Sequence, residues 1–509
     1  MITSVHSDDY PPGDLAWRAL VANIHPTAWR NPTYAGRYNL LIIGAGPGGL
    51  TAAREAARLG ARVALIERTL IGGSRLNAGC VPSKALIRTA RLYAEMRCAQ
   101  NFGGEEPSDP KFSFPEAMAR VKRIQARLSR NDSAQRLSES GIDVYFGDAR
   151  FAGPDSVLVA GQILRFRKAL VATGSQPVIP QIPGLIEAGF LTNETVFNIR
   201  SCPRRLMVIG GGPLGCEGAQ AFCRFGAHVV IAQSDPMFLP KEERDAAQVL
   251  SDALARDGVE IHLNTTVTAV RTEGTTKLVD LLCDGDKSTV SVDEILVGVG
   301  RAPNVEHLNL EAAAVVYDRA AGIRVDDFLR TSNPRIYAAG DVCLDHMFTH
   351  AAAASARIVV RNALFMGRKR LSALTIPWCT YTDPEIAHVG LYVREALEQH
   401  IPVRTFTILM HDVDRAVTDG EDAGFVKIHI KSDSDRILGA TAVARHAGEM
   451  INGISLAITS GIGLREFSRV IHTYPTQAEA IKMAAEAYMR TRLTPSLKSL
   501  SSRWLSYFD

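Results

Sequence analysis

Two stretches of the chain repeat one pattern of apolar and polar positions. In each, a short apolar run leads into a glycine-rich turn, and an alanine-rich stretch follows. The first apolar run is Tyr38 to Ile43 and the second is Leu206 to Ile209. An apolar run of this length before a turn and a helical stretch is typical of a buried strand in a βαβ unit. The repeat predicts an α/β protein with two Rossmann-like dinucleotide-binding domains.

The first turn has the residues expected of a dinucleotide site. Gly44, Gly46 and Gly49 occupy the three glycine positions, and Glu67 ends the next apolar run. Such glycines allow a tight turn and the approach of a pyrophosphate to the helix N-terminus, and the acid binds a ribose hydroxyl pair. A tight turn that binds nothing is the alternative. The strand, helix and acid in register favour the dinucleotide.

The second turn has the same layout with one change. Gly210, Gly212 and Gly215 take the glycine positions, and the next apolar run ends at Gln233 instead of an acid. An acid at this place prefers the ribose of NADH, whereas its absence removes repulsion of the 2′-phosphate of NADPH. Gln233 therefore favours NADPH weakly, and NADH stays open.

Composition narrows the class of protein. The 509 residues have a formal net charge of +3, which gives no electrostatic case for nucleic acid. The eight cysteines form no CxxC pair and have no regular spacing, so we expect a reducing, cytoplasmic location and no metal site. The acidic N-terminus predicts no signal peptide, and no apolar run is long enough to span a membrane.

The segment from Gly72 to Lys84 carries the most specific chemistry. It resembles the redox-disulfide segment of the flavoprotein disulfide reductases, class I of the pyridine nucleotide-disulfide oxidoreductases, and the retained segments look most like the mercuric-reductase-like branch. The resemblance covers roughly residues 38 to 480. It implies FAD at the first site, NADPH or NADH at the second, and a homodimer. It also implies further cofactor contacts from Thr173, Gly174, Gly300, Arg301, Asp341 and Lys84.

The resemblance also divides the chain into domains. Residues 1–37 show no helical period and form an arm, and a mixed pattern of strands and helices after about residue 375 predicts an α+β dimerisation domain. The predicted order is an N-terminal arm (1–37), an FAD-binding domain in two segments (38–185 and 298–374), an NAD(P)-binding domain (186–297), a dimerisation domain (375–490) and a C-terminal tail (491–509).

The chain departs from the family pattern at two positions. Arg75 stands where the substrate-facing thiol belongs, and Tyr474 stands where the family places the catalytic histidine that pairs with an acid, here Glu479. Disulfide exchange needs two sulfurs within bonding distance, and a tyrosine with a usual pKa of about 10 is a poor acid-base at neutral pH. Cys80 still matches the flavin-facing sulfur, or is a buried cysteine kept for packing.

Two further positions match the family. Glu217, on the helix after the second turn, matches the glutamate that pairs with a flavin-side lysine, here Lys84. A solvated helix residue is the alternative for Glu217. Arg75 has three open roles: it stabilises a Cys80 thiolate, docks an anionic substrate or fills the gap left by the missing thiol.

These departures predict that reduced flavin passes electrons directly to a small acceptor such as a quinone. One alternative is a single-cysteine peroxide or oxygen reductase working through Cys80. A mercuric-reductase-like enzyme is another, although tight Hg(II) handling needs paired thiolates and no cysteine follows Cys379. A degenerate flavoprotein acting as a binding or sensor subunit is the third.

The tail after Pro495 has a short apolar stripe. Leu497, Leu500, Trp504 and Phe508 fall near one helical face. We expect this stripe to pack against the last domain, with a weak contact to a membrane surface as the alternative.

Overall fold

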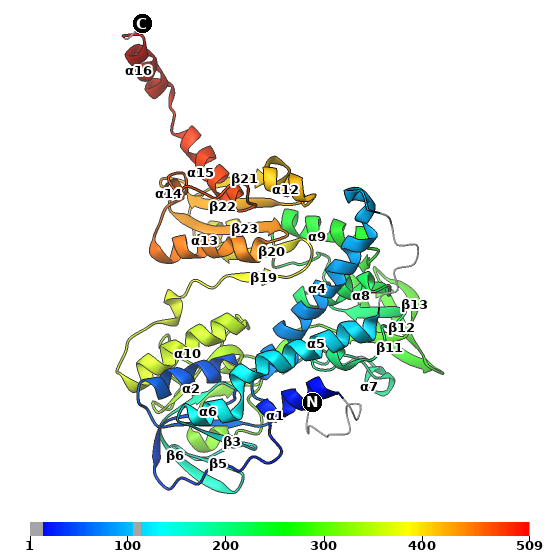
Figure 1. Ribbon diagram of the computed structural model, residues 1–509, viewed down its shortest axis with the longest axis vertical. Coiled ribbons are helices and arrows are strands. Elements are labelled where there is room, and N and C mark those ends of the chain that lie inside the picture. Colours follow the sequence, from blue (N-terminus) through cyan, green and yellow to red (C-terminus); the bar gives the residue numbers. More distant parts are fainter. Residues whose placement is uncertain (1–13, 105–112, 508–509) are drawn as a thin grey trace. The chain divides into compact units, whose positions relative to one another are not determined.

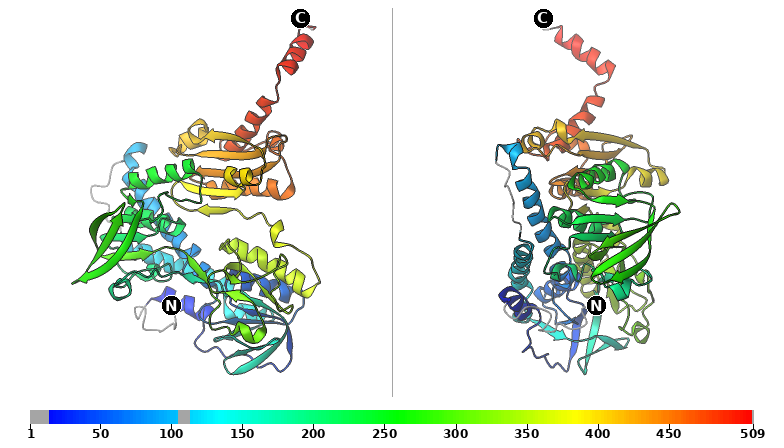
Figure 2. Two further views of the ribbon diagram at one scale, coloured as in Figure 1. Left: turned by 180° about the vertical axis from the view of Figure 1, so that it is seen from behind. Right: turned by 90° about the vertical axis from the view of Figure 1, so that its right-hand side faces the viewer.

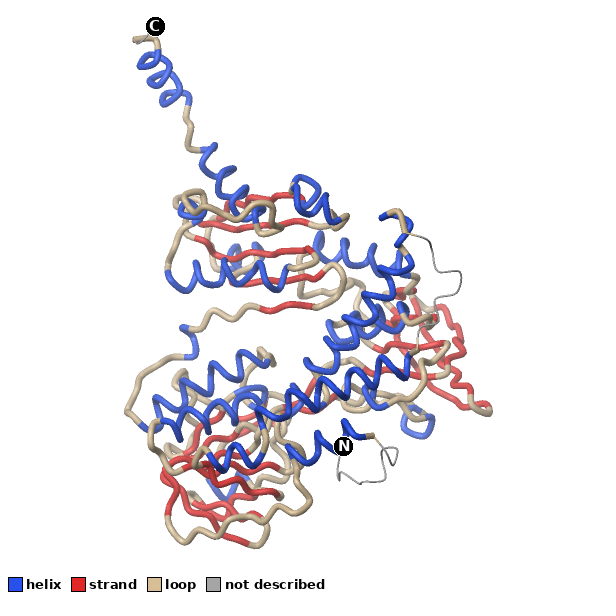
Figure 3. The backbone as a smooth tube through the Cα atoms, viewed as in Figure 1, coloured by secondary structure: helices blue, strands red, loops and turns tan. Residues whose placement is uncertain are grey.

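The computed structural model describes residues 14–104 and 113–507. The chain divides into two compact units, and the first consists of Met1–Pro236 with Gly258–Leu374. The second consists of Met237–Asp257 with Thr375–Asp509. Figure 1 colours the elements along the sequence, and Figure 3 distinguishes the helices, in blue, from the strands, in red. The predicted α/β class with a C-terminal α+β domain is confirmed.

A seven-stranded sheet carries the first glycine-rich turn. Its strand order is β3-β2-β1-β6-β5-β4, with β18 paired to β6. The central strands pair in parallel, and β2 is buried along its whole length because helices cover the sheet. Helices α2 and α10 lie side by side over it (Figure 1). The strands are β1 (Arg37–Ile43), β2 (Val63–Glu67), β3 (Ile142–Phe146), β4 (Arg150–Gly153), β5 (Ser156–Val159), β6 (Gln162–Val171) and β18 (Ile336–Ala338).

The helices of this part follow the predicted turns. Helix α2 starts directly after the first glycine-rich turn, and α4 starts at Cys80. They are α2 (Pro47–Arg58), α3 (Gly73–Asn77), α4 (Cys80–Arg97), α5 (Phe114–Ser129), α6 (Ala134–Glu139) and α10 (Thr349–Leu364). Short elements complete it: η2 (Ala99–Phe102), η3 (Arg130–Asp132), β7 (Ser175–Pro177), β15 (Arg301–Pro303), η5 (Leu310–Ala313), β16 (Tyr317–Asp318), β17 (Gly322–Ile323), η6 (Gly340–Val342) and η7 (Leu371–Ala373).

The N-terminal arm is not irregular throughout, which corrects the sequence expectation. Residues Leu15–Ile24 form helix α1, and the side chain of Asp14 caps it by accepting hydrogen bonds from two backbone N–H groups. Leu20 and Ile24 are buried, and α1 packs on α5. The helix forms because tertiary packing compensates for a weak apolar period.

A four-stranded parallel sheet, in the order β10-β9-β8-β14, carries the second turn. A three-stranded antiparallel sheet, β11-β12-β13, is inserted in the chain between β10 and β14, and its green strands stand out in both views of Figure 2. The elements are α7 (Leu185–Ala188), η4 (Val196–Asn198), β8 (Arg205–Ile209), α8 (Pro213–Arg224), β9 (His228–Ala232), β10 (Glu260–His262), β11 (Thr265–Glu273), β12 (Thr276–Cys283), β13 (Asp286–Val292) and β14 (Glu294–Val297).

The second unit is a five-stranded sheet, in the order β19-β20-β23-β22-β21, with a buried core beneath α13 and α15. It includes α9, although this helix lies between strands of the second nucleotide fold in the sequence. Its elements are α9 (Arg244–Asp257), β19 (Trp378–Thr380), β20 (Glu385–Gly390), α11 (Val393–Glu398), β21 (Val403–Leu409), η8 (Met410–Asp412), α12 (Asp414–Asp419), β22 (Phe425–Lys431), β23 (Ile437–Ala444), α13 (Ala447–Ser460), α14 (Leu464–Phe467), α15 (Glu479–Thr491) and α16 (Pro495–Leu505).

The tail does not pack against the last domain, so that expectation was wrong. Every residue from 491 to 507 is exposed, including Leu500 at 65% and Trp504 at 66%. Thr494 caps α16 and Pro495 opens it, so the chain starts a new helix here instead of extending α15. Phe508 lies outside the described residues. Among the helices of residues 14–104 and 113–507, none is long and apolar enough to cross a membrane.

Candidate active site

The first glycine-rich turn is tied to the carboxylate at the end of β2. Ala45 N donates to Glu67 Oε2 at 2.8 Å, and Thr69 N donates to Glu67 Oε1 at 2.9 Å. Burial raises the pKa of the Glu67 carboxyl group, and the backbone N–H groups of Thr69 and Ala45 act in the opposite direction. Glu67 is thereby fixed at the strand end where a ribose would be expected.

The glycines of this turn meet steric demands. Gly44 has a φ of 101°, and a Cβ on Gly49 would lie 1.8 Å from Gly44 O. Gly46 is the N-cap of α2 and makes no side-chain capping hydrogen bond, and its Cβ position has no neighbour closer than 3.9 Å. The turn therefore leaves open space in front of the first N–H groups of α2, which fits a pyrophosphate.

The second turn repeats this construction with an amide in place of the acid. Gly211 N donates to Gln233 Oε1 at 2.7 Å, so Gln233 binds its turn as Glu67 binds the first. A Cβ on Gly215 would lie 2.0 Å from Gly210 O, and a Cβ on Gly212 would meet nothing within 4 Å. The second site differs from the first mainly in carrying no charge at the strand end.

A hydrogen-bonded network joins the other predicted FAD segments. Ser175 Oγ donates to Asp341 Oδ2 at 2.6 Å, and Arg301 Nε donates to Ser175 Oγ at 2.8 Å. Arg301 Nη1 lies 3.2 Å from Asn193 Oδ1, and Asn193 Nδ2 donates to Ala78 O at 3.0 Å. The network thus extends from Asp341 to the residues just before Cys80.

Two other predicted residues border this network. Thr173 Oγ1 donates to Asn304 O at 2.7 Å, and Asn304 N donates to Gly174 O at 2.9 Å. Gly300 has a φ of 125° and directly precedes Arg301. The structure therefore brings Thr173, Gly174, Gly300 and Arg301 together around β7 and β15.

Cys80 and Lys84 lie one turn apart at the start of α4. Cys80 is exposed, and its Sγ lies 3.5 Å from Thr349 Oγ1, at the start of α10. Lys84 Nζ lies 2.7 Å from Glu217 Oε2 and 3.0 Å from Oε1, which is the pairing expected from the sequence. The Glu217 side chain is only 7% exposed, so it is not the solvated helix residue considered as an alternative.

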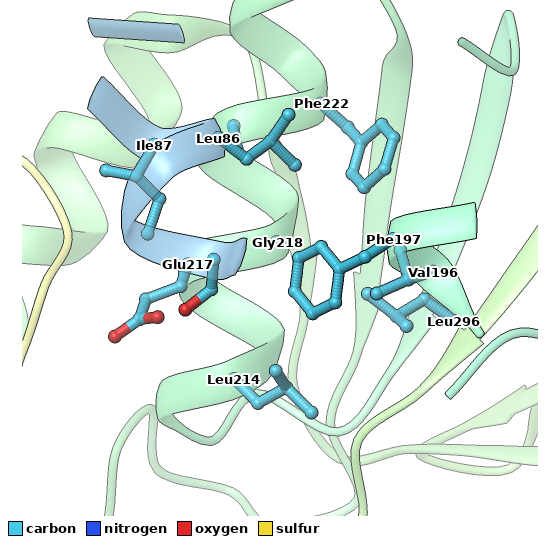
Figure 4. A pocket seen from close by; sticks show the side chains of 11 residues that line it. Leu86, Ile87, Val196, Phe197, Leu214, Glu217, Gly218, Phe222 and Leu296 are labelled. Atoms are coloured by element: carbon cyan, nitrogen blue, oxygen red, sulfur yellow. The ribbon is translucent and has the colours of Figure 1, made fainter. Parts of the chain in front are cut away.

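A small apolar cavity lies beside Glu217. It measures about 20 Å³ and lies between α4, α8 and η4. Phe197, Phe222 and Leu296 line it, and Glu217 lies at its margin (Figure 4). A cavity of this size holds at most one water molecule. It is therefore part of the packing beside the ion pair.

Arg75 is held by an acid on another segment. Its Nη2 forms an ion pair with Asp132 Oδ2, and Arg54 Nη2 binds the other oxygen of Asp132 at 2.7 Å. The Asp132 side chain is 5% exposed, so its charge is compensated by two arginines. The ion pair with Asp132 leaves the three roles considered for Arg75 open. All eight cysteines fall within the described residues, and none of them forms a disulfide.

Tyr474 and Glu479 belong to the second unit. Tyr474 is 65% exposed, and its hydroxyl donates to Asp414 Oδ2 at 2.7 Å. This hydrogen bond raises the pKa of the Tyr474 phenol. Glu479 begins α15, five residues further along the chain. Tyr474 is therefore a hydrogen-bond donor held by an acid, and its phenol stays protonated at neutral pH.

Sequence reasoning missed Asp132, Asp414, Ser175 and Asn193. The two aspartates bind the two residues that depart from the family pattern. They lie 57 and 60 positions away from those residues in the sequence, so no local motif pointed to them. Ser175 directly follows Gly174, but only its contacts show that it joins Asp341 to Arg301.

Comparison with known families identifies both parts of the chain. Residues 38–356 match the pyridine nucleotide-disulphide oxidoreductase model, and residues 376–485 match the dimerisation domain of the same enzymes. The second match supports a homodimer.

Curated relatives extend this similarity. The chain is 32% identical over 452 residues to a mercuric reductase of Staphylococcus aureus, covering 88% of this chain and 82% of that protein. It is 34% identical to a mercuric reductase of Streptomyces lividans, covering 89% of this chain and 96% of that protein. It is 32% identical to a dihydrolipoyl dehydrogenase of Thermus scotoductus, covering 88% and 97%.

Solved structures share the fold. The HOCl-induced flavoprotein disulfide reductase RclA from Escherichia coli is 28% identical with a TM-score of 0.79, covering 88% of this chain and 99% of that chain. LpdA from Mycobacterium tuberculosis is 30% identical with a TM-score of 0.80 and the same coverage.

Proposed function

The chain belongs to the pyridine nucleotide-disulphide oxidoreductase family, whose members use FAD and NAD(P)H, and on that premise we propose how its electrons leave. The protein is an NAD(P)H oxidoreductase in which reduced FAD passes electrons directly to a small acceptor of the quinone class. Two electrons and one proton come from NAD(P)H, and a second proton from solvent completes the hydroquinone.

One observation carries the proposal. The position of the substrate-facing thiol is occupied by Arg75, and this arginine is bound to the buried carboxylate of Asp132. Cys80 is a free thiol. Because thiol-disulfide exchange needs a second sulfur within bonding distance, Cys80 does not complete the exchange within one subunit.

The residues of this chain would hold the cofactors in the following way. Glu67 would bind the ribose of FAD, the N-terminus of α2 would bind its pyrophosphate, and Asp341 would bind its ribityl chain. Gln233 and the second turn would hold NADPH or NADH. When bound, FAD accepts two electrons from the nicotinamide and gives them to the acceptor.

The charged pair has a positioning role in this proposal. Lys84 is a cation beside the predicted flavin position, and the carboxylate of Glu217 fixes its direction through two short contacts. The phenol of Tyr474, bound to Asp414, donates a hydrogen bond and does not serve as the acid-base of a thiol. Cys80 keeps a place against the flavin without a partner sulfur.

A second candidate is reduction of Hg(II). Identities of 32% and 34% to mercuric reductases over nearly nine tenths of the chain favour it. The free thiol of Cys80 is a soft ligand for such an ion, but a single thiolate binds it less tightly than a pair.

A screen of acceptors tests both candidates. The purified protein is assayed with NADPH and with NADH against benzoquinones, naphthoquinones, disulfides, peroxide and Hg(II). We expect turnover with quinones, and turnover unchanged by Cys80→Ser. Turnover with disulfides, or activity on Hg(II) alone that disappears in Cys80→Ser, would contradict direct transfer to a quinone. Reduction of the flavin without turnover on any acceptor would instead favour a binding or sensor subunit.

A further inference from the structure

The N-terminal arm is built into the edge of the sheet that carries the first nucleotide turn. After α1, the arm runs along β3, where Trp29 Nε1 donates to Val144 O at 3.1 Å. The Asn31 side chain binds both backbone groups of Phe146. Asn31 Nδ2 donates to Phe146 O at 2.8 Å, and Phe146 N donates to Asn31 Oδ1 at 2.8 Å. The arm is therefore attached through directional hydrogen bonds as well as apolar packing.

His25, the C-cap residue of α1, joins two strand ends. Its Nδ1 is hydrogen-bonded to Thr69 O, just after β2, and because a carbonyl only accepts, the Nδ1 proton is donated. Its ring lies 4.4 Å from the ring of Phe146, the last residue of β3. A further hydrogen bond joins the arm to the loop after β2, because Ile71 N donates to Ile24 O at 3.3 Å.

These contacts hold the loop between Glu67, at the end of β2, and Gly72, which leads into the Cys80 segment. The loop begins after Glu67, whose carboxylate is bound by Thr69 N, and it ends at Gly72, whose N–H donates to Ala45 O at 2.8 Å. The arm thus contacts the loop between the ribose-binding acid and the segment that leads to Cys80. In open α/β sheets, ligands bind outside the carboxyl ends of the strands, which here are the ends of β2 and β3.

We infer that the arm, through His25, is a retention element for the adenosine half of FAD. His25 is a positioning residue: it holds Thr69 and Phe146, and so keeps the ends of β2 and β3 in the spacing that the adenosine requires. The inference rests on FAD at the first site, as in the proposed function, but not on the identity of the electron acceptor.

The test measures flavin release from the full-length holoenzyme. Flavin-loaded protein is mixed with an excess of an apoflavoprotein that captures released FAD, and the release rate is followed by fluorescence. We expect His25→Ala to release FAD about tenfold faster, since it loses a hydrogen bond and a ring contact. His25→Asn keeps a donor at a similar place but loses the ring, so an intermediate increase of about threefold is expected. Arg18→Gln, on the exposed side of α1, is the matched control and keeps the wild-type rate.

A second readout separates retention of adenosine from general damage. The apoprotein is titrated with FAD, with ADP and with FMN, which lacks the adenosine. Within each histidine variant, the affinity for FAD and the affinity for ADP should fall by the same factor, and the affinity for FMN should stay unchanged.

The outcomes decide the inference. Unchanged release in either variant, or equal weakening of FAD and FMN, overturns it. If His25→Ala does not fold, His25→Asn decides alone. A wild-type protein without affinity for FAD would overturn the proposed function as well, whereas unchanged variants of a flavin-loaded protein overturn this inference only.

Discussion

Replacement of Arg75 by cysteine restores the second sulfur and tests the direct route for electrons. In the wild-type protein, anaerobic titration with NADPH should fully reduce the flavin after about two electrons per subunit, because no disulfide accepts another pair. Arg75→Cys, isolated in air, should form a bridge with Cys80 and take up about four electrons per subunit. Disulfide reductase activity should stay low, because Tyr474 does not supply the acid-base.

The substitution has a cost that follows from the structure. It removes one of the two arginines on Asp132, whose side chain is 5% exposed, and leaves Arg54 at 2.7 Å. A hydrogen bond to a charged group contributes about 1.5–3 kcal/mol, and the remaining arginine reduces the loss to about 1–2 kcal/mol. We expect the Tm to fall by about 1–3 °C, because a unit of this size unfolds with a large entropy change.

Arg54→Gln is the matched control for this experiment. It removes the other arginine on Asp132, so it should lower the Tm to a similar degree and leave the electron uptake at about two. An uptake of about four electrons by the wild-type protein would refute the reasoning, because another cysteine must then pair with Cys80. An Arg75→Cys protein with a proven bridge but unchanged uptake would refute it too.

Three other predictions address other parts of the molecule. Gln233→Glu puts a carboxylate at the end of β9, where it would repel the 2′-phosphate of NADPH. Initial rates with a quinone should show kcat/KM for NADPH falling about tenfold relative to that for NADH. An unchanged ratio would show that Gln233 does not face the 2′-phosphate. Glu243 lies 3.1 Å from Lys427 Nζ and 3.3 Å from His429 Nε2; burial opposes ionisation, but these two side chains outweigh it and lower the pKa of Glu243 to about 2. The Glu243 carboxylate therefore contributes fully to the free energy of unfolding above the usual carboxyl pKa of about 4.5, and this contribution is lost as the pH falls towards about 2. Denaturant titrations should give free energies of unfolding for wild type and Glu243→Gln that differ by about 1–3 kcal/mol at pH 7 and converge at low pH. A difference that stays constant with pH would exclude the carboxylate as its source. Light scattering at micromolar concentration should show a dimer, and a monomer with full activity would contradict the homodimer as the active unit.

The sequence was sufficient for the two nucleotide folds because their glycines meet local demands. A Cβ at Gly49 or Gly215 would collide with the carbonyl oxygen of the first glycine of its own turn, and such a demand is readable from spacing alone. Helix α1 was missed because it depends on burial of Leu20 and Ile24 against α5, which is distant in the sequence. Tertiary packing outweighed the weak local period.

The residues of the candidate site also fall into those that the sequence predicted and those that only the structure identified. The pairing of Lys84 with Glu217 came from the family pattern, which relates two motifs far apart in the chain. Asp132 and Asp414 belong to no motif, and they bind the two residues that depart from that pattern. A substitution that departs from a family has partners that the family does not reveal, so only the structure identifies them.

The way the seven-stranded sheet ends has a consequence for solubility. On one side, the Asn31 amide occupies the outward backbone groups of Phe146 in β3; on the other, Asn309 Nδ2 donates to Phe151 O in β4, and Phe151 N donates to Leu308 O. Open strand edges are templates on which another chain adds a strand and aggregation begins. Here the backbone groups of Phe146 in β3 and of Phe151 in β4 are occupied by the protein's own side chains and loops. A chain that begins after Asn31 would expose the edge of β3, and its failure would be precipitation rather than loss of a catalytic group.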